Sequence, residues 1–420
     1  MLKLATLLKK EVKESGGLNK CLIIDCGDTF HGSIEATLSK GEVIQKIFNY
    51  LHFDVFVPGN HDLEYGTKVL SDRINSLNAD SIAGNLEFKN EHSTKLYDWR
   101  IYKRNGLKIA VIGLTFPFID HWMYHTKKDK YKIKDINKVL KTIFPKILKT
   151  SPDLIILAMH SGLHGSYKFG YSQGIKAIAS NYPEIDIILG GHTHTLYSGT
   201  ILNNNTYYVQ PGCKAEYLAK ITIKYNIKNH SKIINSELLP AASSEIDSDL
   251  SKEIKPLLNK IEKQESEKIA YIPKNKKLNF NKLIAEIMAK STKSDTAIYN
   301  LSYSKKYLKG TVTYKKIYDA LKYEDNIIVL RLSAKELNSI VNEIVKYKKK
   351  KKAYKGFNTW GIPVKKSKNI TLAITSYYAA GARNKFPLLK KLAAEKGINS
   401  KIYLRKAVIN YLRKKYPVKE

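Results

Sequence analysis

The sequence predicts an α/β protein built from two domains. Its 420 residues exceed the length at which a single hydrophobic core usually stops growing. Up to about Tyr225, short apolar runs alternate with amphipathic segments, a pattern typical of helices layered on a sheet. From Ile227 to Tyr271 the apolar pattern thins into polar and charged residues, which indicates a linker. We therefore expect a first domain at residues 1–228, a linker with a helix at residues 229–270 and a second domain at residues 271–420.

The first domain is expected to begin with an amphipathic helix at Leu2–Lys13. Apolar runs then predict strands at Cys21–Asp25, Val55–Val57, Ile109–Gly113, Leu154–Met159 and Ile185–Leu189. Most of these runs lead directly into Gly, Asn, Asp or His. Because open α/β sheets bind ligands beyond the carboxyl ends of their strands, these polar residues are placed to form a site.

The linker is expected to hold a helix at Leu257–Ile269. In the second domain, the apolar periodicity predicts helices at Lys282–Lys290, Ala334–Lys346 and Ile402–Lys415. The apolar segment Asn326–Leu332 and a strand at Ile370–Thr375 accompany them.

The composition excludes little by itself. A formal charge of +34 would suit an anionic partner, but the excess lysine is spread along the chain, so no stable nucleic-acid partner is expected. No apolar stretch reaches the roughly 20 residues that a membrane helix requires. The three cysteines form neither an even disulfide set nor a CxxC pair, and they indicate no redox compartment. The composition says nothing about oligomeric state.

Four short segments that follow expected strands carry the chemistry. They are Asp25-Cys-Gly-Asp28, Gly59-Asn60-His61-Asp62-Leu-Glu64, Met159-His160-Ser-Gly162 and Gly191-His192-Thr-His194. A binuclear phosphatase holds two divalent cations about 3.5–4 Å apart, joined by a bridging carboxylate. Asp28 is the candidate bridge, and the other ligands are assigned to Asn60, His160, His192 and His194. We expect two divalent ions, and Zn, Mn, Mg and Co all remain compatible with these donors.

His61 and Glu64 are assigned as the catalytic pair. His61 follows Asn60 directly, so it is expected to point from the same loop toward the leaving-group oxygen, where it stabilises charge or donates a proton. Glu64 is expected to orient the imidazole and raise its pKa.

These residues resemble the calcineurin-like metallophosphoesterases, and more narrowly the family of 5'-nucleotidases and 2',3'-cyclic-nucleotide phosphodiesterases. The motifs that carry the resemblance are Gly27-Asp-Thr-Phe-His-Gly32, Gly59-Asn-His-Asp62, Asn85-Leu86, His160-Ser-Gly162, Gly191-His-Thr-His194 and Gln210-Pro-Gly212. The resemblance covers essentially the whole chain. It implies a four-layer α/β/β/α catalytic domain, a helical linker and a smaller α+β domain that determines substrate specificity.

The same resemblance implies that two aromatic rings of the second domain clamp the base of a nucleotide. The best matches by position are Phe357 and Tyr377, with Gly381 in the neighbouring loop; plain core packing of these rings remains an open alternative. The family's Gly-Gly-Ile-Arg after Asn300 is replaced by Leu-Ser-Tyr-Ser, and its glycine-rich, Asp-bearing loop by Gly381-Ala-Arg-Asn384. Both changes leave the particular nucleotide open.

The resemblance departs most clearly at the amino end. The family's first strand carries an Asp-x-His pair that supplies two metal ligands, and no residue before Asp28 provides it. The match begins at Leu2–Lys13, so we expect Met1 to be an internal methionine of a longer chain. Related proteins are usually exported, which favours the cell envelope, the periplasm or secretion if a signal peptide precedes Met1. A true start at Met1 would favour the cytoplasm.

The predicted function is hydrolysis of a nucleotide phosphoester of the 5'-nucleotidase type, by in-line attack of a metal-activated water. Two alternatives stay open. One is a 2',3'-cyclic-nucleotide 2'-phosphodiesterase with 3'-nucleotidase activity, which the segment from Tyr323 to Leu337 suits somewhat better. The other is a catalytically impaired relative that binds nucleotides without turning them over.

Overall fold

The computed structural model describes residues 1–90, 93–119, 131–163, 174–202, 205–273, 275, 278–299, 307–350, 358–360, 369–382 and 385–418. The chain divides into two compact units. One unit contains Met1–Pro117 and Lys128–Asn259, and the other contains Lys260–Glu420 together with Phe118–Lys127. Each unit is described by itself below.

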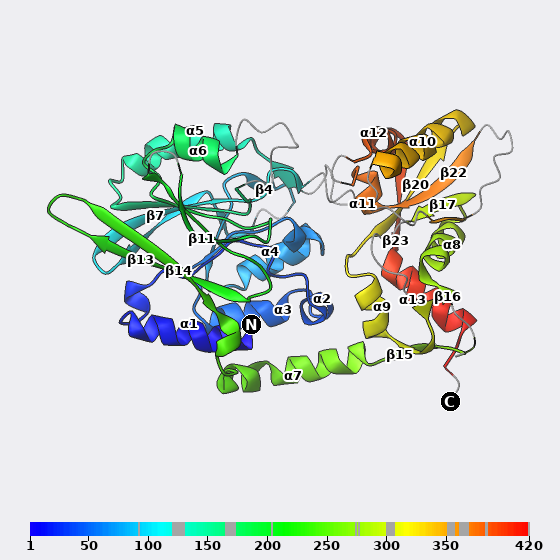
Figure 1. Cartoon of the computed structure of the whole chain (residues 1–420), viewed down its shortest axis with the longest axis horizontal. Helices are drawn as coiled ribbons and strands as arrows, with labels where there is room; N and C mark the ends of the chain where they lie inside the picture. The colour runs from blue at the N-terminus through cyan, green and yellow to red at the C-terminus, as the bar shows by residue number, and fades with distance from the viewer. Residues whose placement is uncertain are drawn as a thin grey trace. The chain divides into compact units, whose positions relative to one another are not determined.

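Two β-sheets form the centre of the first unit (Figure 1). A parallel sheet has the order β1 (Ile24–Asp25), β2 (Val55–Phe56), β3 (Asp80–Ile82), β5 (Leu96–Tyr97). A larger sheet has the order β11 (Leu196–Ile201), β12 (Tyr207–Pro211), β10 (Ile187–Leu189), β9 (Leu154–Met159), β7 (Leu107–Leu114), β6 (Trp99–Arg104). Its four inner strands are parallel, and β6 and β11 close the edges in the antiparallel sense.

The two sheets pack face to face between layers of helices. Val55 and Val57 of one sheet share a buried cluster with Val111 and Ile156 of the other. Helices α5 (Ile136–Leu148) and α6 (Ile175–Asn181) cover the outer face of the larger sheet, where they lie together in Figure 1. Helix α3 (Glu42–Tyr50) covers the parallel sheet, because its Phe48 ring meets Phe56 edge-on with centroids 6.0 Å apart. The α/β fold class is confirmed, and the first unit has the α/β/β/α order of layers.

Other elements of the first unit surround these layers. They are α1 (Leu2–Glu14), α2 (Ile34–Leu38), α4 (Thr67–Asn75), β4 (Leu86–Phe88), β8 (Tyr131–Ile133), β13 (Tyr217–Tyr225), β14 (Lys232–Pro240) and the start of α7 (Ser248–Glu265), with 3-10 turns at η1 (Leu18–Lys20), η2 (His61–Leu63) and η6 (Ala241–Ser243). Strand β14 lies within the range expected to be linker. It pairs with β13 along its whole length, and its Ile234 packs against the cluster between the two sheets. The helix expected at Leu257–Ile269 begins earlier, at Ser248, and ends at Glu265.

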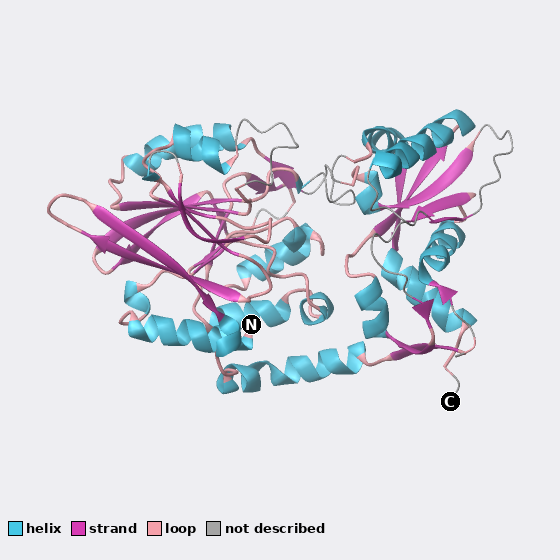
Figure 2. Ribbon diagram, in the orientation of Figure 1, coloured by secondary structure: helices cyan, strands magenta, loops and turns pink. Residues whose placement is uncertain are grey.

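The second unit is built on a mixed sheet covered by helices on both faces (Figure 2). The order is β21 (Asn358–Trp360), β17 (Thr296–Tyr299), β22 (Ile370–Thr375), β20 (Asn326–Leu332), β23 (Gly397–Tyr403). Helices α8 (Phe280–Thr292) and α13 (Leu404–Lys415) cover one face, and α10 (Ala334–Lys350) and α12 (Pro387–Lys396) cover the other. Consecutive residues of β20 serve the two sides, since Ile327 joins the first cluster and Ile328 the second.

The remaining elements of the second unit are short. They are β15 (Lys268–Ile272), β16 (Leu278–Asn279), β18 (Tyr307–Leu308), β19 (Gly310–Thr313), α9 (Tyr314–Ala320) and α11 (Ser376–Ala379). Strand β15 pairs with β19, and β16 with β18. Among the helices that the structure describes in the whole chain, none has the length and apolar character needed to cross a bilayer.

Candidate metal and catalytic site

The loops that carry the predicted metal ligands lie at the carboxyl ends of parallel strands. Asp28 follows β1 and Asn60 follows β2, two strands that pair in parallel. His160 follows β9 directly and His192 follows β10, which also pair in parallel. Because the two sheets face each other, these loops converge at one edge of the sandwich.

Backbone packing between the first two loops depends on glycine. A Cβ added to Gly27 would lie 2.4 Å from the backbone nitrogen of Gly59, and one added to Gly59 would lie 2.3 Å from Asp28 Oδ1. Gly27 also has a φ of 88°, which L side chains rarely adopt. The two loops therefore approach more closely than any other pair of residues would permit.

A buried carboxylate ties these loops together. Asp62, 1% exposed, accepts hydrogen bonds from the backbone nitrogens of Asp28 (2.8 Å), Gly59 (2.7 Å) and Phe30 (2.8 Å). Burial and the charge of Asp28 raise the pKa of Asp62. Asp62 belongs to the Gly59–Asp62 motif, but the sequence did not predict a role for it. Its one sequence signal was an acidic residue inside a glycine-rich loop.

Three of the predicted ligands form one group of donor atoms. A carboxylate oxygen of Asp28 and one ring nitrogen each of His160 and His192 all lie within 4.8 Å of one another. Asp28 Oδ2 is 3.0 Å from His160 Nε2, and the oxygen of the fully buried Asn60 carboxamide is 2.8 Å from His192 Nδ1. One carboxylate, one carboxamide oxygen and two imidazoles are donors that suit Zn, Mn or Co.

The orientation of both imidazoles is fixed by their surroundings. His160 Nδ1 donates to the backbone oxygen of Cys26 at 2.6 Å, which leaves Nε2 as the nitrogen facing Asp28. His160 Nε2 is buried beside the Asp28 carboxylate, in a position that suits a metal ligand. The ring of Phe116 stacks on His192 with centroids 4.0 Å apart and planes 19° apart. Phe116 was not predicted; an aromatic residue just beyond a strand end was its only sequence signal.

His194 stands apart from this group. It is exposed, and the structure does not place it among the clustered donor atoms of the described residues. Asp28, His192 and His194 all have left-handed backbone, with φ of 60°, 66° and 58°. Such strain in non-glycine residues concentrates at functional sites, where the surrounding structure maintains it.

The predicted catalytic pair is in contact. His61 Nδ1 hydrogen-bonds to Glu64 Oε1, and the backbone nitrogen of His61 donates to Asp28 Oδ1 at 2.6 Å. A third side chain joins them, because His31 Nε2 lies 2.8 Å from Glu64 Oε2. His31 belongs to the Gly27–Gly32 motif, but the sequence did not predict a role for it. Its imidazole, that of His61 and the Glu64 carboxylate form a second group of donors next to the Asp28 group.

The charges in the two groups support one another. Burial acts against the charged forms, yet the Asp28 and Glu64 carboxylates raise the pKa of His61 to about 9. Burial likewise opposes ionisation of Glu64, but His31 and His61 lower its pKa to about 2. The charges of His160 and His61 outweigh burial at Asp28 and lower its pKa. At neutral pH this structure therefore holds His61 as a cation beside two carboxylates.

The predicted substrate-binding residues belong to the second unit. Tyr377 is half-buried in α11, just after β22, and its backbone nitrogen donates to Asp325 Oδ1 at 3.0 Å. Gly381 follows that helix with a φ of 89°. Phe357 lies outside the described residues, as do Asn384 and the segment after Tyr299 that replaces the family's Gly-Gly-Ile-Arg.

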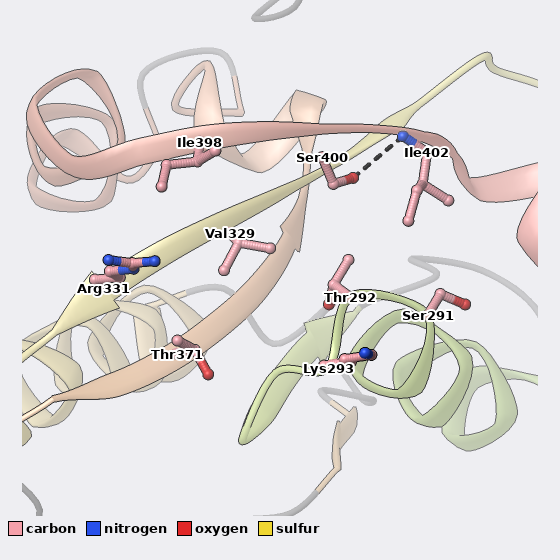
Figure 3. A pocket seen from close by; sticks show the side chains of 9 residues that line it. All are labelled: Ser291, Thr292, Lys293, Val329, Arg331, Thr371, Ile398, Ser400 and Ile402. Carbon is pink, nitrogen blue, oxygen red and sulfur yellow. Dashed lines mark hydrogen bonds between the residues drawn. The ribbon is translucent and has the colours of Figure 1, made fainter.

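A cavity of this unit lies elsewhere on the sheet. Figure 3 shows its lining at the carboxyl end of α8 and over β20, β22 and β23: Ser291, Thr292, Lys293, Val329, Arg331, Thr371, Ile398, Ser400 and Ile402. Among the described residues, neither Tyr377 nor Gly381 lines it.

In comparisons with known proteins, one family model matches mostly within the first unit and another within the second. Residues 3–196 match the model of the calcineurin-like phosphoesterases, and residues 263–365 match that of the 5'-nucleotidase C-terminal domain. A structure from Staphylococcus aureus, assigned to the 5'-nucleotidases, has a TM-score of 0.80 at 18% identity and covers 100% of this chain and 92% of that one. At this identity the structural likeness concerns the fold.

Three relatives are similar in sequence. A 5'-nucleotidase-related protein of Glossina morsitans morsitans is 26% identical over 276 residues, covering 59% of this chain and 47% of its own length. A 5'-nucleotidase of Vibrio cholerae is 23% identical over 386 residues, covering 80% and 69%. A 2',3'-cyclic-nucleotide 2'-phosphodiesterase/3'-nucleotidase of Salmonella typhimurium is 24% identical over 208 residues, covering 46% and 31%.

The chain thus spans about half the length of the Glossina relative and a third of the Salmonella one. The fold, the two matched regions and the relatives nevertheless agree on one assignment. The chain combines a calcineurin-like phosphoesterase domain, from a metal-dependent family, with a 5'-nucleotidase C-terminal domain.

Proposed function

We propose that this chain hydrolyses the phosphoester bond of a nucleotide, in the manner of a 5'-nucleotidase, and that it uses two divalent metal ions. The observation that carries the proposal is the convergence of Asp28, Asn60, His160 and His192 next to the cationic His61. Cation ligands beside a proton donor are the two parts that phosphoester hydrolysis requires. The names of the relatives support the choice of nucleotides as substrates.

The donors divide between the two ions. One ion would be held by Asp28, Asn60, His160 and His192, whose donor types fit a divalent cation. The second would share the Asp28 carboxylate and take His194, which lies two residues after His192 in the same loop, outside the group of clustered donor atoms. When bound, the ions activate a water for in-line attack on phosphorus and offset the charge that develops on the phosphate.

The protein's own side chains supply the remaining steps. His61, held as a cation by Asp28 and Glu64, would donate its Nε2 proton to the leaving oxygen of the nucleoside. Glu64 would keep the imidazole turned so that Nδ1 faces the carboxylate and Nε2 faces the substrate. Tyr377, with Phe357 and Gly381, would bind the base; stacking of one base on an aromatic ring contributes about 1–3 kcal/mol.

The second candidate is hydrolysis of 2',3'-cyclic nucleotides followed by release of the 3'-phosphate. It is favoured by the Salmonella relative and by the segment from Tyr323 to Leu337. Both reactions would use the same metal and acid groups, so the substrate alone separates them.

The test is phosphate release from AMP and from 2',3'-cyclic AMP, measured after chelation and again after Mn²⁺ or Zn²⁺ is restored. We expect hydrolysis only with the metal, and faster hydrolysis of AMP. Preference for the cyclic substrate would favour the second candidate. Binding of AMP without any turnover by the metal-loaded protein would contradict both and favour an impaired nucleotide-binding relative. His160→Asn removes a proposed metal ligand and should abolish the metal-dependent hydrolysis. His52→Asn, at an exposed histidine, is its matched control.

A further inference from the structure

Glu64 has one imidazole at each of its two carboxylate oxygens. His61 Nδ1 contacts Oε1, and His31 Nε2 lies 2.8 Å from Oε2. The side chains of His31 and Glu64 are only 3% and 8% exposed, so water does not compete for this contact. The Glu64 carboxylate is therefore held at both ends.

The ring of His31 is itself firmly placed. It stacks on His61 with centroids 5.6 Å apart and planes 17° apart, and Tyr65 packs against it with centroids also 5.6 Å apart. The preceding residue, Phe30, donates its backbone nitrogen to Asp62, the carboxylate that also holds the Asp28 and Gly59 loops. His31 is thus fixed to the same framework as the metal ligands.

A carboxylate at the end of a glutamate side chain rotates easily, because its last torsion angle has a broad energy profile. With only one partner, Glu64 could swing away from His61 and release the imidazole. A second partner on the far oxygen leaves one arrangement, in which Oε1 faces His61 Nδ1. Partners of this kind, one step behind the reacting groups, typically change activity about 10- to 100-fold when removed.

We propose that His31 is a positioning residue, which holds Glu64 so that His61 keeps its Nε2 directed at the leaving oxygen. This inference rests on the proposed hydrolase function. In the step it serves, the water oxygen forms a bond to phosphorus, the bond from phosphorus to the nucleoside oxygen breaks, and that oxygen receives the proton from His61 Nε2. The water releases a proton to the medium. His31 and Glu64 exchange no atoms with the substrate.

The kinetic test compares two leaving groups in the metal-loaded enzyme. AMP releases an alkoxide that needs a proton, whereas p-nitrophenyl phosphate releases a phenolate that leaves without one. His31→Leu should lower kcat for AMP about 10- to 100-fold with KM unchanged, and should lower kcat for p-nitrophenyl phosphate by no more than about 3-fold. His31→Gln, which keeps a donor able to reach Glu64, should restore most of the loss. His52→Asn should change neither substrate's kinetics.

His31→Asn guards against a folding defect in the leucine variant. It keeps a polar side chain that is too short to reach Glu64, so it should reproduce the selective loss on AMP. An equal loss on both substrates by His31→Leu and His31→Asn, or a failure of His31→Gln to recover activity, would overturn the proposal.

A second measurement does not depend on turnover. In the full chain with ¹⁵N-labelled histidine, the Nδ1 resonance of His61 should show a carboxylate-bonded imidazole in the wild type and in His31→Gln. It should lose that signature in His31→Leu and His31→Asn. If the wild type hydrolyses neither substrate, the proposed function fails, and this spectrum still decides whether His31 positions Glu64. An unchanged His61 resonance in both short variants refutes the role.

Discussion

The close approach of the Asp28 and Asn60 loops predicts a large effect from adding one methyl group. In Gly59→Ala the new Cβ would lie 2.3 Å from Asp28 Oδ1 and 2.4 Å from the Asp28 backbone nitrogen, where ordinary contacts begin at 3.4 Å. Backbone atoms cannot swing aside as a flexible side chain can. The loops must therefore separate by about 1 Å, a displacement that can lower a rate about 100-fold.

The same clash costs stability. Overpacking typically costs about 1–3 kcal/mol, which corresponds to a fall of about 2–12 °C in the melting temperature of a unit of this size. Gly59 does not have left-handed backbone, so the cost comes from the clash and not from an unfavourable φ. Gly174→Ala is the matched control, because a Cβ there meets nothing within 4 Å.

Three measurements on Gly59→Ala check this reasoning: calorimetric melting of the first unit, affinity for Mn²⁺ and kcat for AMP. We expect all three to fall in Gly59→Ala and none to change appreciably in Gly174→Ala. A Gly59→Ala protein with wild-type melting, metal affinity and rate would refute the claim that the two loops must pack backbone against backbone.

Four further outcomes are expected. In the metal-free protein, His61 should titrate near pH 9 by NMR, and Glu64→Gln should lower that pKa because one of the carboxylates that raise it is lost. Because folding raises the pKa of His61, its cation stabilises the metal-free fold fully below about pH 6.5, and this stabilisation is lost as the pH rises through about 9. A melting temperature independent of pH across this window would contradict the prediction. Phe116→Ala should lower the free energy of unfolding by about 3–5 kcal/mol, and it should weaken Mn²⁺ binding because it frees the imidazole on which Phe116 stacks. Phe116→Leu should keep most of the stability and most of the affinity. Calorimetry and isothermal titration would measure the two quantities. Arg405→Ala should destabilise the second unit by about 3–5 kcal/mol because it breaks a buried ion pair. Arg413→Ala, at an exposed ion pair, should cost less than about 1 kcal/mol. Equal melting temperatures of the two variants would contradict this difference.

Much of the fold followed from periodicity alone. Strands at Leu154–Met159 and Ile370–Thr375, and the apolar segment Asn326–Leu332, were expected at the same residues where the structure has β9, β22 and β20. These segments are almost entirely buried, so their composition reflects their surroundings directly. The fold class and the family followed from glycine-rich strand ends that carry Asp, Asn and His.

Partner-dependent elements were harder to predict. Strand β14 mixes polar and apolar residues and is held in place by pairing with β13 along its whole length. Strand β23 includes Ile402, which periodicity assigned to the last helix, because β20 pairs with it. In the site, the expected ligands were assigned from polar residues in glycine-rich loops at the ends of expected strands. Asp62, Phe116 and His31 act through contacts with other loops, and sequence spacing carries no record of such contacts.

The most direct test of the metal site is an anomalous difference map from crystals of the full chain loaded with Mn²⁺ or Zn²⁺. The account predicts a peak about 2.0–2.2 Å from the nearest donor atoms of Asp28, Asn60, His160 and His192. A map with no peak there, or with metal bound only at other residues, would contradict the assignment on which the proposed hydrolysis depends.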